Sequence, residues 1–492
     1  MMKRREFGLK VLQMAGAGTL LEAAGASARA GTAFSMPAAG LGANPSSDPR
    51  LRGAYRFERD RWVYVHLEGT PAEIGFQHGY LLAPEITDAF KAVKLTNCRG
   101  TSKSPDFFRH AARENLWPKV YPEYQEEIEG IQKGLAARGA RMSLDDLIWL
   151  SAMEELADYY VPWYDKRHKV AELRPILSPG NCSAFVATGS WTKDHHIVIA
   201  HSCWTSYLHG ERWNIMFDIA PQHGFRILMD GFPGVITSDD DFGINSDGLM
   251  ITETTISQFH GWNPDGKPEF ARARKAMQYS SSIDDYVRIM LDGNNGGYAN
   301  DWLLGDRKTG EVAQFELGLK AWRVWRSKDG YFMGSNFARD PKVIAEDTTF
   351  NPHDLSTSPN ARRVRGDQLI KEHKGQIDVA FGQQFLSDHY DSWLKKENPG
   401  TRTLCGHGDL SPTGEKIWGW GPYHPSGAIT GKASDSRMTA AMQMVARRGH
   451  PCGGDFLAKP FLKAHPQYAW QEPLLHDMIA GPWSTFKGGE HV

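Results

Sequence analysis

The feature that most limits the possible folds is a change of pattern at Cys182. From about Tyr64 to Tyr164, apolar residues recur mainly with helical spacing. After residue 182 the chain turns to short runs rich in alternating, β-branched and aromatic residues, which predict strands. Strands interrupted by helices favour sheets that are covered by helices. We therefore expect an α+β fold, or a layered αββα arrangement.

The expected elements are short and are separated by turn residues. The first part should contain helices at 72–80 and 126–131, and a third helix capped by Ser143. Asp306 to Gly310 is typical of a hairpin turn. The second part should contain helices at 270–279 and 283–291 and strands at 183–188, 197–200, 213–219, 225–229, 249–255, 302–305, 312–317 and 321–326.

Cys182 itself is a candidate nucleophile. The turn-like residues Ser178 to Gly180 predict a loop that delivers Cys182 to the first residue of a strand. A cut between Asn181 and Cys182 would give the thiol its own α-amine, with a pKa of roughly 7.7 to 8.0, as a base. The alternative is a small buried cysteine on a core strand. The local pattern fits both interpretations.

The N-terminus resembles a twin-arginine export signal. Lys3, Arg4 and Arg5 precede an Ala/Gly-rich run at 11–28, and small residues follow that suit a cleavage site. We expect a signal peptide at 1–30 and a spacer at 31–50. The protein should then be periplasmic or secreted. No later apolar run is long enough for a bilayer, so we expect no integral membrane segment after signal removal.

Charge and cysteine content narrow the partners. A formal net charge of -2 gives no electrostatic reason to expect nucleic acid, and it favours small-molecule partners. Five cysteines in an oxidising compartment leave at least one thiol unpaired, and Cys405 and Cys452 are a candidate disulfide pair. No CxxC, finger-like or H-E-x-x-H spacing occurs. We therefore expect neither a metal site nor a cofactor.

Six motifs follow Cys182 in the sequence: His201-Ser202-Cys203-Trp204, Phe232-Pro233-Gly234, Ser238-Asp239-Asp240-Asp241-Phe242, Glu253-Thr254-Thr255, Tyr298-Ala299-Asn300-Asp301-Trp302 and Ser335-Asn336. Taken together and in this order, they resemble the phospholipase B-like family. A segment before Cys182, Gly69 to Gly79, is more distantly similar to the penicillin acyltransferase-type self-processing hydrolases. The resemblance implies the four-layer αββα sandwich of the N-terminal-nucleophile hydrolases.

The resemblance also implies how the chain is divided. Cys182 matches the family nucleophile, which is released when the precursor cuts itself between Asn181 and Cys182. Residues 51–181 would then be a mostly helical propeptide or α-chain. Residues 182–492 would be the catalytic β-chain.

Further site residues follow by matching the motifs. His201 and Trp204 match pocket residues, although each also fits a buried structural role. Thr255 matches an active-site threonine that positions the amine or the attacking water, and Asn300 suits the stabilisation of an oxyanion. Three weaker candidates are Asn336, which also fits a plain turn former, Glu253, which shares a strand face with Thr255, and Arg362, whose cluster 362–365 is better explained as a solvated helix face than as a head-group site.

These expectations combine into one hypothesis. The chain should be an exported, self-processing cysteine hydrolase that cuts an amide or ester bond of an acylated small molecule or lipid through a cysteinyl acyl-enzyme. Alternatives are a phospholipase B-like lipid deacylase and a non-catalytic exported binding protein with the same fold. A serine hydrolase is disfavoured because no G-x-S-x-G elbow occurs. Nothing in the sequence indicates the oligomeric state.

Overall fold

The computed structural model describes residues 48–170, 181–238 and 241–491, which belong to one compact unit. The expected signal peptide, most of the spacer and the loop at Ser178 to Gly180 lie outside the described residues. Within the described ranges, no helix has both the length and the apolar composition that crossing a membrane requires.

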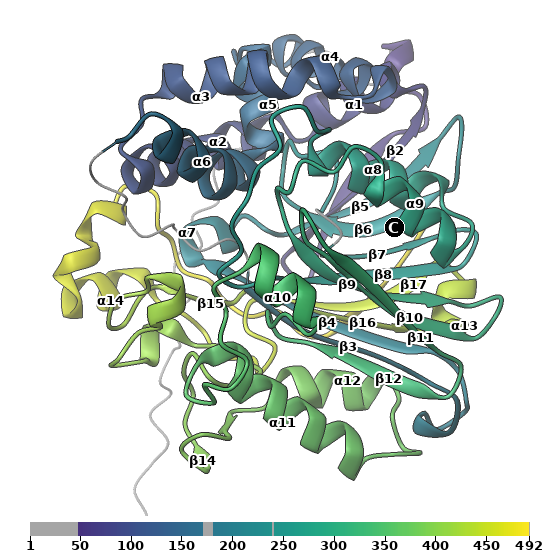
Figure 1. The fold of residues 1–492 in the computed structure, drawn as a ribbon. Coiled ribbons are helices and arrows are strands. Elements are labelled where there is room, and N and C mark those ends of the chain that lie inside the picture. The colour runs from purple at the N-terminus through teal and green to yellow at the C-terminus, as the bar shows by residue number, and fades with distance from the viewer. Residues whose placement is uncertain (1–47, 171–180, 239–240, 492) are drawn as a thin grey trace, which may run out of the picture. The chain divides into compact units, whose positions relative to one another are not determined.

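Two large sheets form the centre of this unit (Figure 1). The first sheet has nine strands, and only its β2–β5 pair is parallel. In spatial order these are β1 (Tyr55–Arg59), β2 (Trp62–Gly69), β5 (Ile215–Pro221), β6 (Ile227–Gly231), β7 (Phe242–Asn245), β8 (Leu249–Thr255), β9 (Asn300–Asp306), β10 (Glu311–Leu317) and β11 (Trp322–Ser327).

The second sheet is antiparallel and carries the strand of Cys182. Its order is β12 (Gly330–Gly334), β3 (Asn181–Thr188), β4 (Val198–Ser206), β16 (Thr430–Asp435), β17 (Gln443–Arg448) and β18 (Ser484–Lys487), and β15 (Ser426–Ala428) also pairs with β4. A separate hairpin pairs β13 (Tyr390–Asp391) with β14 (Lys396–Glu397).

Helices cover both outer faces of the two sheets (Figure 1). The first sheet packs against α1 (Pro71–Leu81), α2 (Ala83–Thr101), α4 (Pro122–Ala137), α5 (Leu144–Ser151), α8 (Glu269–Tyr279) and α9 (Ile283–Leu291). The second packs against α10 (Pro341–Asp347), α11 (Ser358–Glu372) and α12 (Val379–Leu386). The remaining helices are α3 (Pro105–Ala111), α6 (Val161–Arg167), α7 (Tyr207–Gly210), α13 (Ser436–Ala440) and α14 (Ala458–Ala464).

Three apolar cores separate these layers. Val186 and Ile199 of the second sheet meet Met250 and Leu303 of the first between the two sheets. The outer cores join each sheet to its own helices. The expected four-layer αββα sandwich is therefore confirmed.

The first part of the chain is less purely helical than its pattern suggests. Helix α1 and the Ser143 cap of α5 form as expected, but Trp62–Gly69 is a strand that pairs with β5. This strand is buried over most of its length, so its apolar run does not alternate. Such a run cannot be distinguished from a buried helix by periodicity alone. The predicted division at Cys182 stays a prediction, but the segment before Cys182 contributes strands to the first sheet.

The outer helix layer depends on a close approach of α1 and α4. A Cβ added at Gly75 would lie 1.8 Å from the carbonyl oxygen of Glu127, and one at Gly79 would lie 2.1 Å from that of Ile131. These contacts are backbone atoms that cannot rotate away. Only glycine therefore allows the two helices to lie so close together.

Replacing Gly75 with alanine should force α1 away from α4. We expect Gly75→Ala to lower the free energy of unfolding by about 2 kcal/mol or more, because overpacking displaces backbone. Chemical denaturation followed by circular dichroism measures this loss. Gly400→Ala is the control, since its nearest contact would be 3.5 Å away, and its change should stay within about 1 kcal/mol. Equal losses in the two variants would contradict the packing described.

Candidate active site

Cys182 lies on β3 between the two sheets and is fully buried. The backbone register places it directly opposite Cys203 of β4. Its Sγ lies 3.4 Å from Oε1 of Glu253 and 3.8 Å from Oδ1 of Asp241. Burial, the contact with Cys203 and the negative charge of Asp241 raise the pKa of the thiol well above its ordinary value. In the intact chain the thiol is therefore protonated at neutral pH.

Two carboxyl groups, those of Asp241 and Glu253, lie against the thiol, and a lysine lies beside Asp241. The ammonium of Lys432 lies 2.8 Å from Oδ2 of Asp230 and 3.9 Å from Oδ2 of Asp241. Burial, together with Cys182 and Asp241, raises the pKa of Glu253 well above its ordinary value. The site therefore contains a protonated Glu253 beside the thiol, and an Asp241 that faces a cation. Such a pair can pass a proton to or from sulfur.

His201 lies in the same buried group but does not carry a charge. Its Nε2 is 3.7 Å from Oδ1 of Asp241. Burial and the charge of Lys432 lower its pKa well below the ordinary value. The imidazole is therefore neutral at neutral pH. Among the described residues, neither ring nitrogen has a hydrogen-bond partner.

The backbone nitrogen of Cys182 is held by a side chain. It donates a hydrogen bond of 2.9 Å to Oδ1 of Asn336, whose Nδ2 donates to the carbonyl oxygen of Thr255 at 2.9 Å. Asn336 is fully buried and has φ of 68°, a left-handed conformation that costs energy for any residue other than glycine. Both ends of its amide are engaged, so the group has one orientation.

Arg362 holds the other side of Cys182. Its guanidinium donates to the carbonyl oxygen of Cys182 at 2.5 Å and to Oδ1 of Asn336 at 2.8 Å, and it stacks 4.3 Å from the ring of Trp204. Burial lowers its pKa to about 9, so it stays charged at neutral pH. The expectation of a solvated helix face at Arg362 is wrong, because α11 presents this residue to the second sheet.

The other predicted residues lie around this centre. Trp204 is fully buried between Arg362 and Trp418, and Asn181 is its register partner on β3. Oγ1 of Thr255 donates to the hydroxyl of Tyr298 at 2.9 Å. Of the predicted residues, Glu253, Asn336 and Arg362 therefore contact Cys182 directly, and Thr255 reaches it through Asn336.

Asn300 has a different setting. It is the register partner of Thr255 on β9, and its side chain is fully buried. Within the part of the chain that the structure describes, neither polar atom of its amide has a hydrogen-bond partner. An unpaired buried amide is costly, and it is the kind of donor that oxyanion stabilisation needs. No contact of the Asn300 side chain with Cys182 is observed among these residues.

A small cavity borders the residue before Cys182. It encloses about 60 Å³ and is lined by Asn181, Thr255, Phe259 and Trp418, among others. A second cavity of about 130 Å³ shares Asp158 and Trp418 with the first. Asn181, the residue before Cys182, therefore borders a small cavity.

Sequence reasoning missed Asp241, Lys432 and Cys203 as members of the site. Asp241 lies inside one of the motifs that carry the family resemblance, and Cys203 lies in another, so those motifs were the available signal. Lys432 is a lone lysine in the middle of a short buried strand. A lysine is almost never fully buried unless it is paired, which is the signal that this strand offered.

The group around the nucleophile also has the composition of a metal site. Cys182, His201, Asp241 and Glu253 offer donor atoms that all lie within 4.8 Å of one another. However, Lys432 already places a positive charge beside Asp241, and Glu253 is protonated. The donors therefore do not need a metal ion to balance their charge, and we assign none to this group.

The fold and the site define the class first. A four-layer sandwich with a buried cysteine at the head of a central strand is the arrangement that the resemblance to N-terminal-nucleophile hydrolases predicts. The chain belongs to the phospholipase B family, because the model of that family, described as Phospholipase B, matches residues 74–324, which is just over half of the chain.

Individual relatives are more distant. The chain is 28% identical to putative phospholipase B-like 2 of Mus musculus over 363 residues, covering 62% of this chain and 57% of the relative. It is 25% identical to phospholipase B-like 1 of Homo sapiens, covering 48% and 47%. The chain thus spans about half the length of the curated relatives it matches.

Solved structures show a weaker likeness. A mutant form of conjugated bile acid hydrolase from Clostridium perfringens aligns with 12% sequence identity and a TM-score of 0.33. The alignment covers 54% of this chain and 88% of that one.

The contacts of Arg362 can be tested in the background of the variant Cys182→Ala, which keeps the backbone carbonyl that Arg362 binds. We expect Arg362→Lys to lower the free energy of unfolding by about 2 kcal/mol or more, because lysine cannot make the forked contacts and leaves buried acceptors unpaired. Arg363→Lys, one residue along α11, is the control and should change it by less than about 0.5 kcal/mol. Urea denaturation measures both. Indistinguishable midpoints would show that Arg362 does not hold the strand of Cys182.

Proposed function

We propose that this protein is a self-processing hydrolase in which Cys182 becomes an N-terminal nucleophile that cuts the amide or ester bond of an acylated small molecule or lipid. The observation that carries the proposal is the set of contacts that hold Cys182 in place. Its nitrogen is bound to Asn336, its carbonyl to Arg362, and its sulfur lies against two carboxyl groups. Membership of the phospholipase B family supports a hydrolase.

The first reaction is the cleavage of the chain by itself. The thiol of Cys182 gives its proton to Asp241, and the sulfur attacks the carbonyl carbon of Asn181. The carbon–nitrogen bond then breaks, the nitrogen of Cys182 takes up a proton, and Asn181 is left as a thioester on sulfur. Addition of one water molecule releases the carboxylate of Asn181 and restores the thiol. Cys182 then has a free α-amine.

The second reaction uses that amine as the base. Oδ1 of Asn336 accepts a hydrogen bond from the nitrogen in the intact chain, and it keeps this contact when the nitrogen becomes an amine. The amine takes the thiol proton while sulfur attacks the acyl carbon of the substrate, and it returns the proton to the leaving group. Water then hydrolyses the acyl-enzyme. Asn300 is the proposed donor to the oxyanion.

The substrate class follows from the lining of the adjoining cavities. The cavity beside Asn181 is lined by apolar residues such as Phe259, Ile417 and Trp418, and by polar residues that include Asn181 and Thr255. The apolar residues suit an acyl chain, and the polar residues suit a scissile carbonyl. The family favours lipid esters among these substrates, so a lipid deacylase is the main candidate within the proposal.

Substrate turnover tests the proposed activity. Purified protein is incubated with N-acyl amides and with phospholipids, and the release of free fatty acid is measured. Cys182→Ala should reduce release on the order of a thousand-fold or more, because no other group can form the acyl-enzyme. Cys98→Ala is the control, since Cys98 is a cysteine of α2 outside this site, and most of the activity should remain.

Two outcomes would overturn the activity. If the two variants lose release equally, Cys182 is not the nucleophile. If the folded wild-type protein binds acylated compounds without releasing acid from any of them, the chain is a binding protein that retains the fold.

We further propose that the chain is exported through its twin-arginine-like N-terminus. Residues 1–47 lie outside the described residues, so support comes from the sequence alone. In a bacterium with a twin-arginine pathway, the wild type should reach the periplasmic fraction. A double change, Arg4→Lys with Arg5→Lys, should retain the chain in the cytoplasm. Export that is unaffected by the double change would contradict this route.

A further inference from the structure

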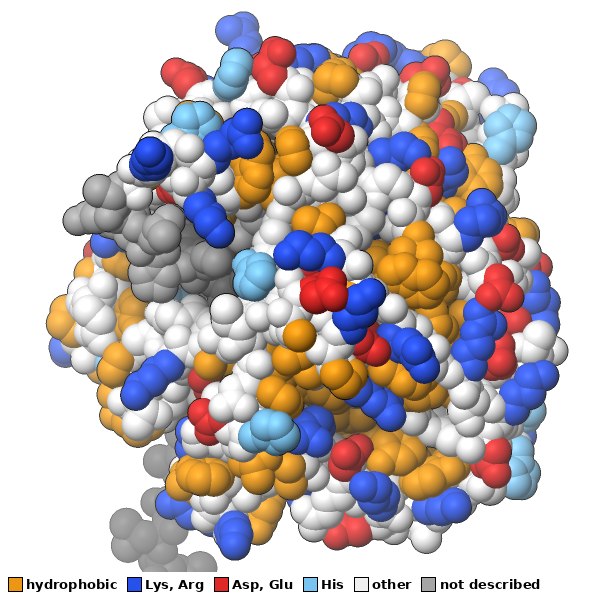
Figure 2. Space-filling model, viewed as in Figure 1, with side chains coloured by type: hydrophobic (Ala, Val, Ile, Leu, Met, Phe, Trp, Pro, Cys, Tyr) orange, Lys and Arg blue, Asp and Glu red, His pale blue; other side chains and the backbone are white. Residues whose placement is uncertain are grey.

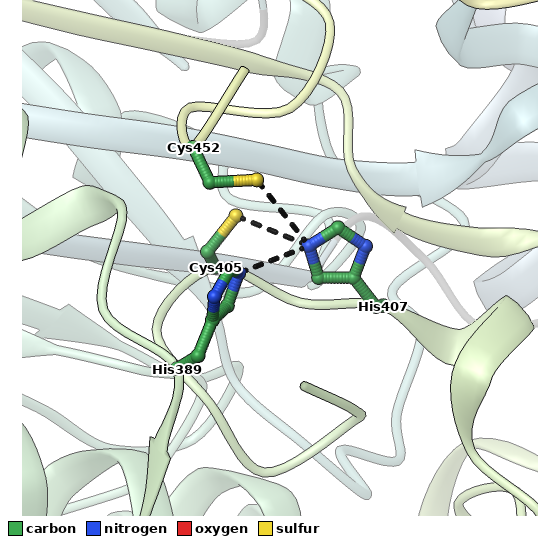
Figure 3. A group of neighbouring side chains, drawn as sticks. All are labelled: His389, Cys405, His407 and Cys452. Carbon is green, nitrogen blue, oxygen red and sulfur yellow. Dashed lines mark hydrogen bonds between the residues drawn. The ribbon is translucent and has the colours of Figure 1, made fainter. Parts of the chain in front are cut away.

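A second group of metal-ligand side chains lies outside the nucleophile site. His389, Cys405, His407 and Cys452 come from three separate loops, and their donor atoms all lie within 4.8 Å of one another. Figure 3 shows that His389 and both cysteines approach the same ring nitrogen of His407. The sequence spacing gives no hint of this group, because folding alone brings positions 389 and 452 together.

The distances between these atoms fit a single tetrahedral ion. Nε2 of His407 lies 3.1 Å from Nε2 of His389, 3.5 Å from Sγ of Cys405 and 3.6 Å from Sγ of Cys452. Zinc bonds of about 2.0–2.1 Å to nitrogen and about 2.3 Å to sulfur give tetrahedral edges of about 3.3 Å between nitrogens and about 3.6 Å from nitrogen to sulfur. The observed edges match these lengths closely.

The surroundings of the group are those of a metal ligand set. Nδ1 of His407 lies 4.0 Å from Oδ1 of Asp409, which places a carboxylate near this side of the ring at a distance longer than a hydrogen bond. That carboxylate accepts a hydrogen bond of 2.6 Å from Tyr207. Carboxylates near the far nitrogen of a ligating histidine are common around metal sites.

Backbone geometry also holds the cysteines in place. The N–H of Gly454 points at Sγ of Cys452 at 3.4 Å, and the N–H of Cys405 donates to the carbonyl oxygen of Asp388. Gly406, between the two ligands Cys405 and His407, lies flat on Trp204, where a Cβ would come within 2.3 Å of the ring. These contacts therefore hold the loop in the conformation that brings the donor atoms together.

We infer that His389, Cys405, His407 and Cys452 form a structural zinc site. Two thiolates and two neutral imidazoles balance the charge of Zn²⁺, and binding releases the two thiol protons. All four positions are filled by the protein, so the ion would hold structure and would not activate water. This inference does not depend on the proposed function.

The zinc site would stabilise the aromatic cluster that lies beside the nucleophile site. Cys405 packs in one apolar cluster with Trp204, Trp418 and Trp420, and Cys452 lies against the same cluster. The guanidinium of Arg362 in turn stacks on the ring of Trp204. An ion that ties the three loops together therefore fixes the ring on which Arg362 rests.

The alternative chemistry is a disulfide between Cys405 and Cys452. In the structure both are free thiols in contact with His407. A disulfide would remove both donors and leave the two histidines without a metal. The two states are mutually exclusive, so one set of measurements separates them.

The experiment measures zinc in the purified full-length chain by elemental mass spectrometry. We expect about one zinc per chain in the wild type and at least a ten-fold lower content in Cys405→Ser and His407→Gln. Cys98→Ser is the control, because Cys98 lies outside the group, and it should keep its zinc. Cobalt(II) in place of zinc should give the thiolate charge-transfer absorption of a tetrahedral site.

A second measurement on the wild type is independent of how the variants fold. Zinc should protect Cys405 and Cys452 from alkylation, and a chelator should expose both. A folded protein that takes up no zinc while its thiols are free would overturn the inference. So would a Cys405–Cys452 disulfide found by peptide mapping without reduction.

Discussion

The hydrogen bond from the nitrogen of Cys182 to Asn336 is the interaction on which the rest of the site depends. It fixes the backbone at the head of β3, and it costs Asn336 a left-handed conformation. The strained conformation is held because Arg362 donates to the same Oδ1 and Nδ2 of Asn336 donates to the carbonyl oxygen of Thr255. Four elements from distant parts of the sequence therefore converge on one peptide unit.

The layered fold explains how these elements meet. Cys182 and Asn336 belong to the second sheet or its adjoining loop, whereas Glu253 and Thr255 belong to β8 of the first. The sulfur thus lies where the two sheets face each other, and burial there favours the protonated forms of the thiol and of Glu253. The surface of the molecule, unlike this buried site, carries many charged side chains. Figure 2 shows positive and negative side chains interspersed over the visible face, and the formal net charge is only -2.

The sequence predicted the layered fold well, for physical reasons that can be named, and the role of Cys182 as nucleophile stays a prediction. β8 and α9 have the bounds that their patterns predict, because each has a regular period and clear ends. β16 was not predicted, since its small and polar residues resemble a loop and are buried only by neighbouring strands. Arg362 was misread because an arginine on a helix is normally exposed, and only long-range contacts reveal its buried partners. The group formed by His389, Cys405, His407 and Cys452 was not predicted either, because only long-range contacts bring these residues together.

The central claim is that the peptide bond before Cys182 is cut by the thiol of Cys182 itself, and intact mass with N-terminal sequencing tests it most directly. The account predicts two fragments in the purified wild-type protein and in Cys98→Ala, with the larger fragment beginning Cys-Ser-Ala-Phe. It predicts one uncut chain in Cys182→Ala. A wild-type protein that is folded and remains a single chain would contradict the account, because Cys182 would then have no amine to serve as its base.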